Sequence, residues 1–239
     1  MLPVDPAHSA RLNAVPHLVT HLSPERIAPY ETDATARGVD AITLYSYNLS
    51  LAASLLGPLN VAEIVVRNAM QGALSAHFGR DDWWEDARVE LPTYQENSLR
   101  DVQEKLRKKF AREGGRPVLP CDVVAALEFG FWTGLLGDGP EGYSFERQLW
   151  QPALRRGFPY NRRDRDGFRK LVDGVRRLRN RVMHHEPLYR DKHKTALRYE
   201  DILYVIASVS PELRTWVDQT GSARHRLAAQ PTDYKGLRF

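Results

Sequence analysis

The residues of this sequence best suited to chemistry are Arg179 and His184. They lie five positions apart in a segment that runs Arg-Asn-Arg-Val-Met-His-His-Glu-Pro. An imidazole can take up or release a proton near neutral pH. A guanidinium can bind a phosphate group and offset the negative charge that develops on it during a reaction. The segment therefore predicts acid–base chemistry on a phosphodiester.

Arg179 belongs to a predicted helix that runs from about Asp164 to Met183. The apolar positions of this helix share one face and are Phe168, Leu171, Val172, Val175, Leu178 and Val182. Arg179 falls within that face, where an arginine is costly to bury unless it is paired. We therefore expect either a buried carboxylate beside Arg179, or a cleft or subunit interface that opens there.

The best candidate for this carboxylate is Glu63, on a predicted central helix. Arg67 follows four positions later, at the spacing of an ion pair within one helix. Two arrangements stay open. Glu63 reaches across to Arg179 and supports the site with Arg67, or Glu63 and Arg67 form a local pair that only holds the fold.

The predicted helix ends around His184 and His185, because Pro187 disfavours the helical conformation at Glu186. A helix C-terminus favours the protonated form of an imidazole. We expect no metal site here, because these histidines and Glu186 are consecutive, whereas helical ligands recur at spacings such as His-Glu-x-x-His. A phosphate-cradling glycine motif and a serine or cysteine nucleophile signature are also absent, and we expect no cofactor.

Positive charge is concentrated around this motif. The chain has a net charge of +4, yet residues 155–190 hold twelve basic against four acidic residues, a net of +8. A local excess of arginine is typical of phosphate binding. The neighbouring Arg176, Arg177 and Arg181 are therefore candidates for contacts with a nucleic acid. A solvated basic face would explain the same excess.

The composition is that of a soluble globular protein of 239 residues, with 42% hydrophobic and 27% charged residues. A single cysteine excludes a disulfide framework within the chain and agrees with a reducing cytosol. Uninterrupted apolar runs are shorter than a membrane span needs, and the N-terminus has no pattern of a secretory signal. We expect a cytoplasmic protein with no membrane partner.

The apolar periodicity predicts an all-α protein, and no change of composition marks a domain boundary. We expect a single domain over residues 1–239 with frayed ends at about 1–10 and 230–239. A first helix is expected to begin at Ser23-Pro24. The other predicted helices are a helix capped by Asp40 that ends at Leu56 before Gly57-Pro58, a helix capped by Asn60 that ends at Phe78, then Ser98–Arg112, Val123–Leu136 capped by Asp122, Phe145–Arg156, Tyr199–Val209 and Pro211–Asp218.

The motif resembles the Arg-x4-His motif of the HEPN superfamily, and its longer form through Pro187 and Leu188 resembles the Abi-like (abortive infection) branch. Other segments fit that branch in the same order along the chain. They are Leu22-Ser23-Pro24, Glu63-Ile64-Val65-Val66-Arg67-Asn68-Ala69, Phe129-Gly130-Phe131-Trp132, Leu149-Trp150-Gln151-Pro152-Ala153-Leu154 and Ser210-Pro211-Glu212-Leu213. The resemblance spans about residues 20–220 and leaves the ends, 1–20 and 228–239, poorly matched.

The resemblance implies a HEPN-like helical bundle with additional peripheral helices. It also implies a metal-independent endoribonuclease, in which the RNA 2′-hydroxyl attacks the neighbouring phosphorus and leaves a 2′,3′-cyclic phosphate. In these roles His184 would transfer the proton, Arg179 would bind the scissile phosphate, and Asn180 would orient the substrate or a partner motif. His185 and Glu186 either position His184 or anchor the loop.

The resemblance further implies a homodimer with a composite active site, a toxin-like role in phage defence, and an antitoxin that is a protein or an RNA. Residues five positions apart diverge by about 140° on an ideal helix. One motif therefore wraps a phosphate poorly, whereas two copies across a two-fold axis could do so. Two other functions stay open: a non-catalytic module that binds RNA or a nucleotide, and a structural or interaction protein.

Overall fold

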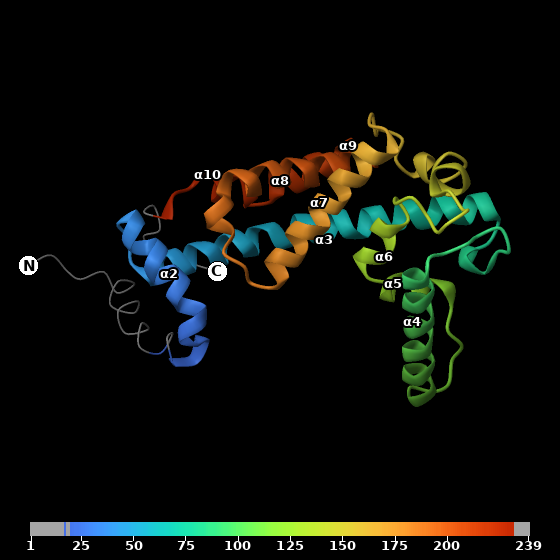
Figure 1. Cartoon of the computed structure of the whole chain (residues 1–239), viewed down its shortest axis with the longest axis horizontal. Helices are drawn as coiled ribbons and strands as arrows, with labels where there is room; N and C mark the ends of the chain where they lie inside the picture. Colours follow the sequence, from blue (N-terminus) through green and yellow to red (C-terminus); the bar gives the residue numbers. More distant parts are fainter. Residues whose placement is uncertain (1–16, 18–19, 232–239) are drawn as a thin grey trace, which may run out of the picture. The chain divides into compact units, whose positions relative to one another are not determined.

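The computed structural model describes residue 17 and residues 20–231, which form helices and contain no strand (Figure 1). The all-α class is therefore confirmed for this part of the chain. The elements are α2 (Pro24–Arg37), α3 (Ala41–Phe78), η1 (Trp83–Glu85), α4 (Thr93–Arg112), α5 (Pro120–Ala126), α6 (Phe129–Gly134), η2 (Glu146–Trp150), η3 (Leu154–Gly157), α7 (Arg165–Met183), η4 (Leu188–Asp191), α8 (Lys192–Ala207), α9 (Pro211–Thr220) and α10 (Ala223–Ala228). The N-terminal segment expected to lack a secretory signal and nearly all of the expected frayed ends lie outside the described residues.

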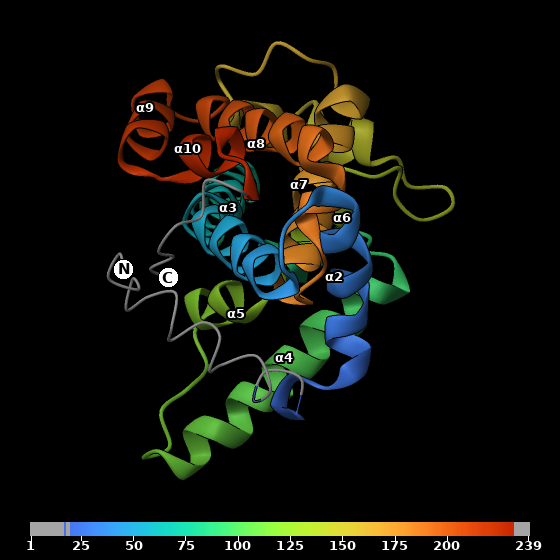
Figure 2. The ribbon, with the colours of Figure 1, turned by 90° about the vertical axis from the view of Figure 1, so that its left-hand side faces the viewer.

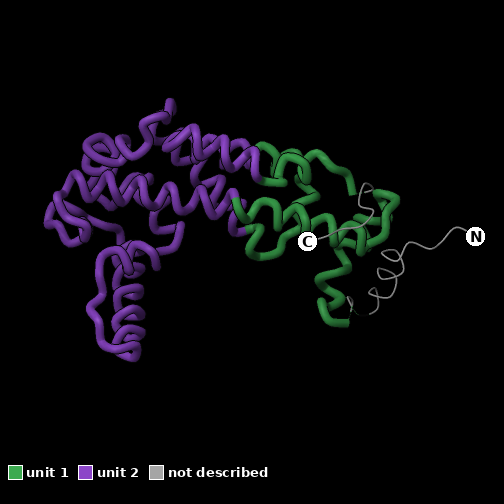
Figure 3. The backbone as a smooth tube through the Cα atoms, turned by 180° about the vertical axis from the view of Figure 1, so that it is seen from behind, with its two compact units in different colours: residues 1–57, 181–197, 221–239 green, residues 58–180, 198–220 purple. Residues whose placement is uncertain are grey.

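The chain forms two compact units, coloured separately in Figure 3. Unit 1 consists of residues 1–57, 181–197 and 221–239, and unit 2 of residues 58–180 and 198–220. Each unit thus combines segments that are far apart in the sequence, where composition alone showed no boundary.

Helix α3 runs without a break through Gly57 and Pro58, so the predicted separation into two helices at this dipeptide is wrong. Proline inside a helix removes a backbone hydrogen bond and costs about 3 kcal/mol. One apolar stripe nevertheless continues on both sides of it. Its members, each at most 1% exposed, are Leu44, Tyr47, Leu51, Leu55, Leu59, Ala62, Val66, Met70 and Leu74. Burial contributes about 1.5–3 kcal/mol for each large apolar side chain, which offsets the cost of the proline.

Among the described residues, α3 is also the one helix long and apolar enough to cross a membrane by length and composition. The sequence predicts no such segment from its uninterrupted apolar runs, which are too short; the apolar residues of α3 are interrupted by polar ones. A core helix of a soluble protein meets the same criteria, and α3 has the buried stripe that such a helix needs. These criteria alone therefore assign no location to the protein.

The predicted continuous helix Val123–Leu136 is wrong, because extended backbone at Leu127 and Glu128 separates α5 from α6. The break lets both short helices bury their apolar side chains. These side chains are Val123, Val124, Leu127, Phe129, Phe131 and Trp132. Both helices lie beside α4 in unit 2 (Figure 1).

Asp122 holds the first turn of α5. Its carboxylate accepts hydrogen bonds from the Arg116 guanidinium at 2.7 and 2.8 Å and from the Leu119 backbone N–H at 2.9 Å. These contacts lower the pKa of Asp122 to about 2. The N-cap of the helix is Leu119, so Asp122 stabilises this helix start from inside the first turn rather than from the predicted cap position.

Four other predictions differ from the structure. Helix α4 begins at Thr93, five residues before the predicted start at Ser98. A π-helical turn and a 3-10 turn, η2 and η3, replace the predicted helix Phe145–Arg156, because Pro152 has no N–H to continue the pattern. Helix α8 begins at Lys192, before the predicted start at Tyr199. Helix α10 was not predicted.

Helix α7 agrees with the prediction in both extent and buried face. It spans Arg165–Met183, and Asp164 accepts a hydrogen bond from the Gly167 backbone N–H at 2.8 Å in the first turn. Figures 1 and 2 show that the unit 2 part of α7 lies next to α3, and an ion pair between Glu63 and Arg179 joins the two helices.

Candidate functional site

The chain turns sharply at the end of α7, directly after Met183. The His185 N–H donates to the carbonyl of Val182 at 3.1 Å, and the Glu186 N–H donates to the carbonyl of Arg181 at 3.0 Å. This pair of bonds is the Schellman arrangement that ends many helices. Its left-handed position usually holds glycine, but here it holds His185 with a φ of 57°. We call residues 181–188 the α7 turn.

A left-handed backbone costs a residue other than glycine about 1–2 kcal/mol, so the α7 turn needs other contacts to hold it. One is an ion pair between Arg181 Nε and Glu186 Oε2, 2.9 Å apart, which spans the turn. Pro187 follows and prevents the helix from continuing. Most of the motif after position 180 therefore has a structural role in helix termination.

Two side chains from α2 and α3 hold the α7 turn inside unit 1. Asn48 is 2% exposed; its amide donates to the carbonyl of Glu186 at 3.2 Å and accepts from the Leu188 N–H at 2.7 Å. Arg26 donates to the carbonyl of His185 at 2.8 Å. The backbone after His184 is thus held by both of these side chains.

The side chains of His184 and His185 are both exposed. Within the described part of the chain, the His184 imidazole forms no hydrogen bond or ion pair. Both of its nitrogens are therefore available to exchange a proton with a ligand, while the backbone that carries the ring is held in place.

The border between the two units falls between Asn180 and Arg181. The predicted site residues before this border, together with Glu63 and Arg67, therefore belong to unit 2. Arg179 Nε lies 3.3 Å from Glu63 Oε2, and these side chains are 37% and 22% exposed. Arg67 instead donates to Asn68 at 3.1 Å. Of the two arrangements that the sequence left open, the structure has the one in which Glu63 reaches Arg179. Asn180 is half-buried.

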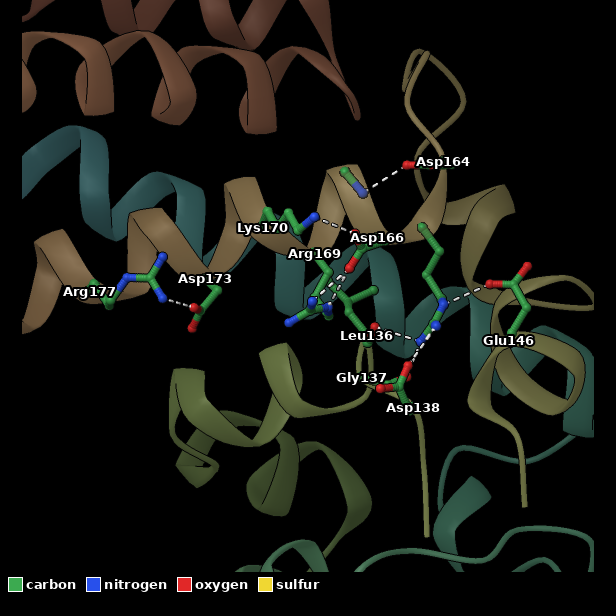
Figure 4. A network of polar contacts seen from close by, with 12 residues as sticks. Leu136, Gly137, Asp138, Glu146, Asp164, Asp166, Arg169, Lys170, Asp173 and Arg177 are labelled. Atoms are coloured by element: carbon green, nitrogen blue, oxygen red, sulfur yellow. Dashed lines mark hydrogen bonds and ion pairs between the residues drawn. The ribbon is translucent and has the colours of Figure 1, made fainter. Parts of the chain in front are cut away.

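Arg176 and Arg177, two of the predicted RNA-binding residues, share one carboxylate. Arg176 Nη2 lies 2.7 Å from Asp173, and Arg177 contacts the other oxygen of the same carboxylate (Figure 4). One positive charge of this trio is therefore uncompensated. The third candidate, Arg181, is engaged in the α7 turn by Glu186.

Acidic side chains also neutralise the first half of α7 (Figure 4). Arg165 pairs with Asp138 at 2.9 Å and with Glu146 at 2.7 Å, and Asp166 pairs with both Arg169 and Lys170 at 2.6 Å. The positive charge of residues 155–190 is thus unevenly distributed, because ion pairs neutralise the basic residues in the first half of α7.

Sequence reasoning missed Arg26 and Asn48. Asn48 gave one usable signal, because it is a polar residue next to the apolar stripe of a central helix. Arg26 gave none, since its contact with residue 185 joins distant parts of the sequence.

No group of three histidine, cysteine, aspartate or glutamate side chains among the described residues could hold a metal ion. No protein-family model matches the chain, and neither a curated protein nor a solved structure matches it significantly. The geometry of its own residues is thus what supports a function for this chain.

Proposed function

We propose that this protein is an endoribonuclease that cleaves RNA without a metal ion, with His184 and Arg179 as its catalytic residues. The observation that carries this proposal is His184, an exposed imidazole with no partner among the described residues, on a turn whose backbone Asn48 and Arg26 hold. A helix terminus needs no free imidazole at this position, whereas proton transfer does.

In the proposed reaction the His184 imidazole takes the proton of a ribose 2′-hydroxyl. The 2′-oxygen then forms a bond to the adjacent phosphorus and the bond from phosphorus to the 5′-oxygen breaks. The leaving 5′-oxygen takes a proton from the His184 imidazolium, which returns to its neutral form. Arg179 binds the phosphate and offsets the charge that develops on it. Glu63 orients the Arg179 guanidinium, at the 3.3 Å distance described above. The products are a 2′,3′-cyclic phosphate and a 5′-hydroxyl.

We further propose that two chains act as a homodimer in which their motifs face each other. The angular divergence of positions 179 and 184 on a helix supports this arrangement, since two copies related by a two-fold axis supply both groups to one phosphate. The resemblance to Abi-like HEPN proteins supports a HEPN-like bundle and a toxin-like role in phage defence. It also supports a cytoplasmic location and a protein or RNA antitoxin.

The test is incubation of the purified protein with labelled RNA in EDTA. We expect fragments with 2′,3′-cyclic phosphate ends. His184→Ala should lower the rate by about 10²–10⁴-fold, the usual contribution of a general acid or base. Arg179→Ala should lower it by about 10²–10³-fold. His193→Ala is the matched control, because His193 is exposed in α8 and lies outside the motif. Folded His184→Ala protein that cleaves at the unaltered rate would contradict the proposal.

One observation favours a second function, a module that binds RNA or a nucleotide without cleaving it. Arg176 and Arg177 share the single carboxylate of Asp173, and the positive charge left over attracts an anion without any proton transfer. Retention of intact RNA in the same experiment would support this function. Neither cleavage nor retention would support a structural or interaction protein.

A further inference from the structure

Unit 1 contains a cavity of about 540 Å³ beside the α7 turn. Its wall includes Ser23, Arg26 and Tyr30 from the start of α2, and Pro187 and Arg190 from the segment after α7. We call it the Arg26 cavity. Arg26 also donates to the carbonyl of His185, so the cavity is next to the backbone that carries His184.

The guanidinium of Arg26 forms no ion pair with any described residue, although the Glu25 carboxylate also lines the cavity. Its hydrogen bond in this part of the chain is to the neutral carbonyl of His185. The nearby Glu25 carboxylate is held by its own backbone N–H and by the Ser23 hydroxyl, which lower its pKa. Arg26 therefore keeps both a positive charge and further N–H donors for a ligand.

Tyr30 also lines the cavity, and its buried hydroxyl is a second unsatisfied group. Tyr30 is 2% exposed, and its hydroxyl forms no hydrogen bond with any described residue. Burial and the neighbouring Tyr45 raise the pKa of this phenol to about 12, although the charges of Arg26 and Arg190 act in the opposite direction. The phenol thus stays protonated as a donor, close to two guanidinium groups.

Arg190 is held in a fixed position at the cavity wall. Its Nε lies 2.6 Å from Asp33 Oδ2, and the Tyr189 hydroxyl donates to the same oxygen at 2.6 Å. These two contacts lower the pKa of Asp33. Arg190 Nη2 donates to the carbonyl of Pro29 at 3.4 Å. The Arg190 side chain is still 45% exposed, which leaves Nη1 open to a ligand.

Backbone strain is concentrated at the same place. Ser23 and His185, with φ values of 71° and 57°, are the described residues other than glycine that have a positive φ. Ser23 lines the Arg26 cavity, and Arg26 holds His185. Strained residues of this kind persist where surrounding contacts enforce them, and they cluster at ligand clamps.

We propose that the Arg26 cavity binds a phosphate group through Arg26, Arg190 and the Tyr30 hydroxyl. This group is a backbone phosphate of the RNA substrate, next to the phosphodiester linkage that is cleaved at His184. The RNA source rests on the proposed function. Phosphate binding follows from two guanidinium groups and one unpaired hydroxyl around one cavity, because charged hydrogen bonds from such donors favour an anion.

The first test measures binding of labelled single-stranded RNA to the His184→Ala chain, so that cleavage does not interfere, at several salt concentrations. Adding Arg26→Gln should weaken binding and reduce the slope of log K against log salt by about 0.7, the loss of one phosphate contact. The control, Arg100→Gln on α4, should leave the slope unchanged. An unchanged slope and affinity in Arg26→Gln would overturn the proposal, whether or not the wild-type chain cleaves RNA.

The second test uses Tyr30→Phe, which removes only the unpaired hydroxyl. We expect its melting temperature to equal or exceed that of the parent chain, while its affinity for RNA falls about tenfold. Tyr189→Phe is the matched control, and it should lower the melting temperature because its hydroxyl hydrogen-bonds Asp33. Unaltered affinity of a folded Tyr30→Phe chain would remove the hydroxyl from the site.

Competition by inorganic phosphate and by AMP distinguishes the two possible sources of the phosphate group, which are an RNA strand and a free nucleotide. With RNA as the source, both should displace RNA from the parent chain only at millimolar concentrations, and less effectively from Arg26→Gln. Micromolar binding of AMP that depends on Arg26 would instead assign the cavity to a free nucleotide and overturn the RNA assignment.

Discussion

Replacement of His185 by glycine is predicted to stabilise the protein, because residue 185 has a φ of 57°. Relief of the left-handed conformation is worth about 1–2 kcal/mol. Glycine makes the unfolded chain more flexible, which costs about 0.5–1 kcal/mol. The His185 ring is exposed, so its removal loses little buried surface. The net gain is about 0.5–1 kcal/mol, which for a chain of this size raises the melting temperature by about 1–4 °C.

The assay compares thermal melts of wild type, His185→Gly and His185→Ala at neutral pH. His185→Ala removes the same ring but keeps the left-handed strain, so its melting temperature should stay near that of the wild type. RNA cleavage by the same proteins separates the two roles of His185. Unaltered cleavage in both variants assigns His185 to anchoring the α7 turn, whereas equal losses in both assign its ring to positioning His184.

A lower melting temperature for His185→Gly than for wild type would refute this reasoning. It would mean that residue 185 is not left-handed in solution, or that its ring makes a contact that stabilises the fold. The Arg26 hydrogen bond does not confuse the result, because Arg26 donates to the backbone carbonyl of residue 185, which glycine retains.

Three further outcomes are expected. A double-mutant cycle of Glu63→Ala and Arg179→Ala should give a coupling energy of about 0.2–1 kcal/mol in thermal or urea unfolding, as half-exposed ion pairs do; a coupling of zero would contradict the contact. Gly72→Ala should stabilise the protein by about 0.5–1 kcal/mol, because Gly72 is exposed inside α3 with open space around it. Gly57→Ala should gain less than Gly72→Ala, because the proline ring at position 58 disfavours a helical residue with a Cβ before it; an equal gain in both variants would contradict a helix that continues through Pro58. The carboxyl carbon of Asp122 should titrate by NMR near pH 2, so its contribution to stability is present above the unfolded pKa of about 3.9 and is lost as the pH falls toward 2.

Local patterns of the sequence predicted the helices whose apolar spacing is regular. The prediction for α7 was within one residue at its start, because one face carries a valine, leucine or phenylalanine every three or four positions. The same periodicity continues in α3 on both sides of Pro58. Gly57 and Pro58 predicted a helix end there, but burial of the apolar stripe stabilises a continuous helix.

The parts of the site that could not be predicted depend on contacts between distant segments. Arg26 and Asn48 reach the α7 turn from α2 and α3 across more than a hundred residues of sequence, and no local pattern encodes such a meeting. The contact between Glu63 and Arg179 was one of two that the sequence predicted for Glu63, the other being with Arg67. An acidic residue on a buried helix needs a cation, and Arg179 needs a carboxylate.

The α7 turn separates the motif into residues that end a helix and residues that do not. Arg181, Glu186 and Pro187 terminate α7 by an ion pair and by blocked helix growth, and His185 occupies the position where glycine would cost less. These roles account for the second half of the motif without any chemistry. They leave the His184 ring, which is carried on a backbone that is held in place and which pairs with nothing among the described residues. Proton transfer requires an imidazole that is free in this way, so the proposed catalysis depends on His184.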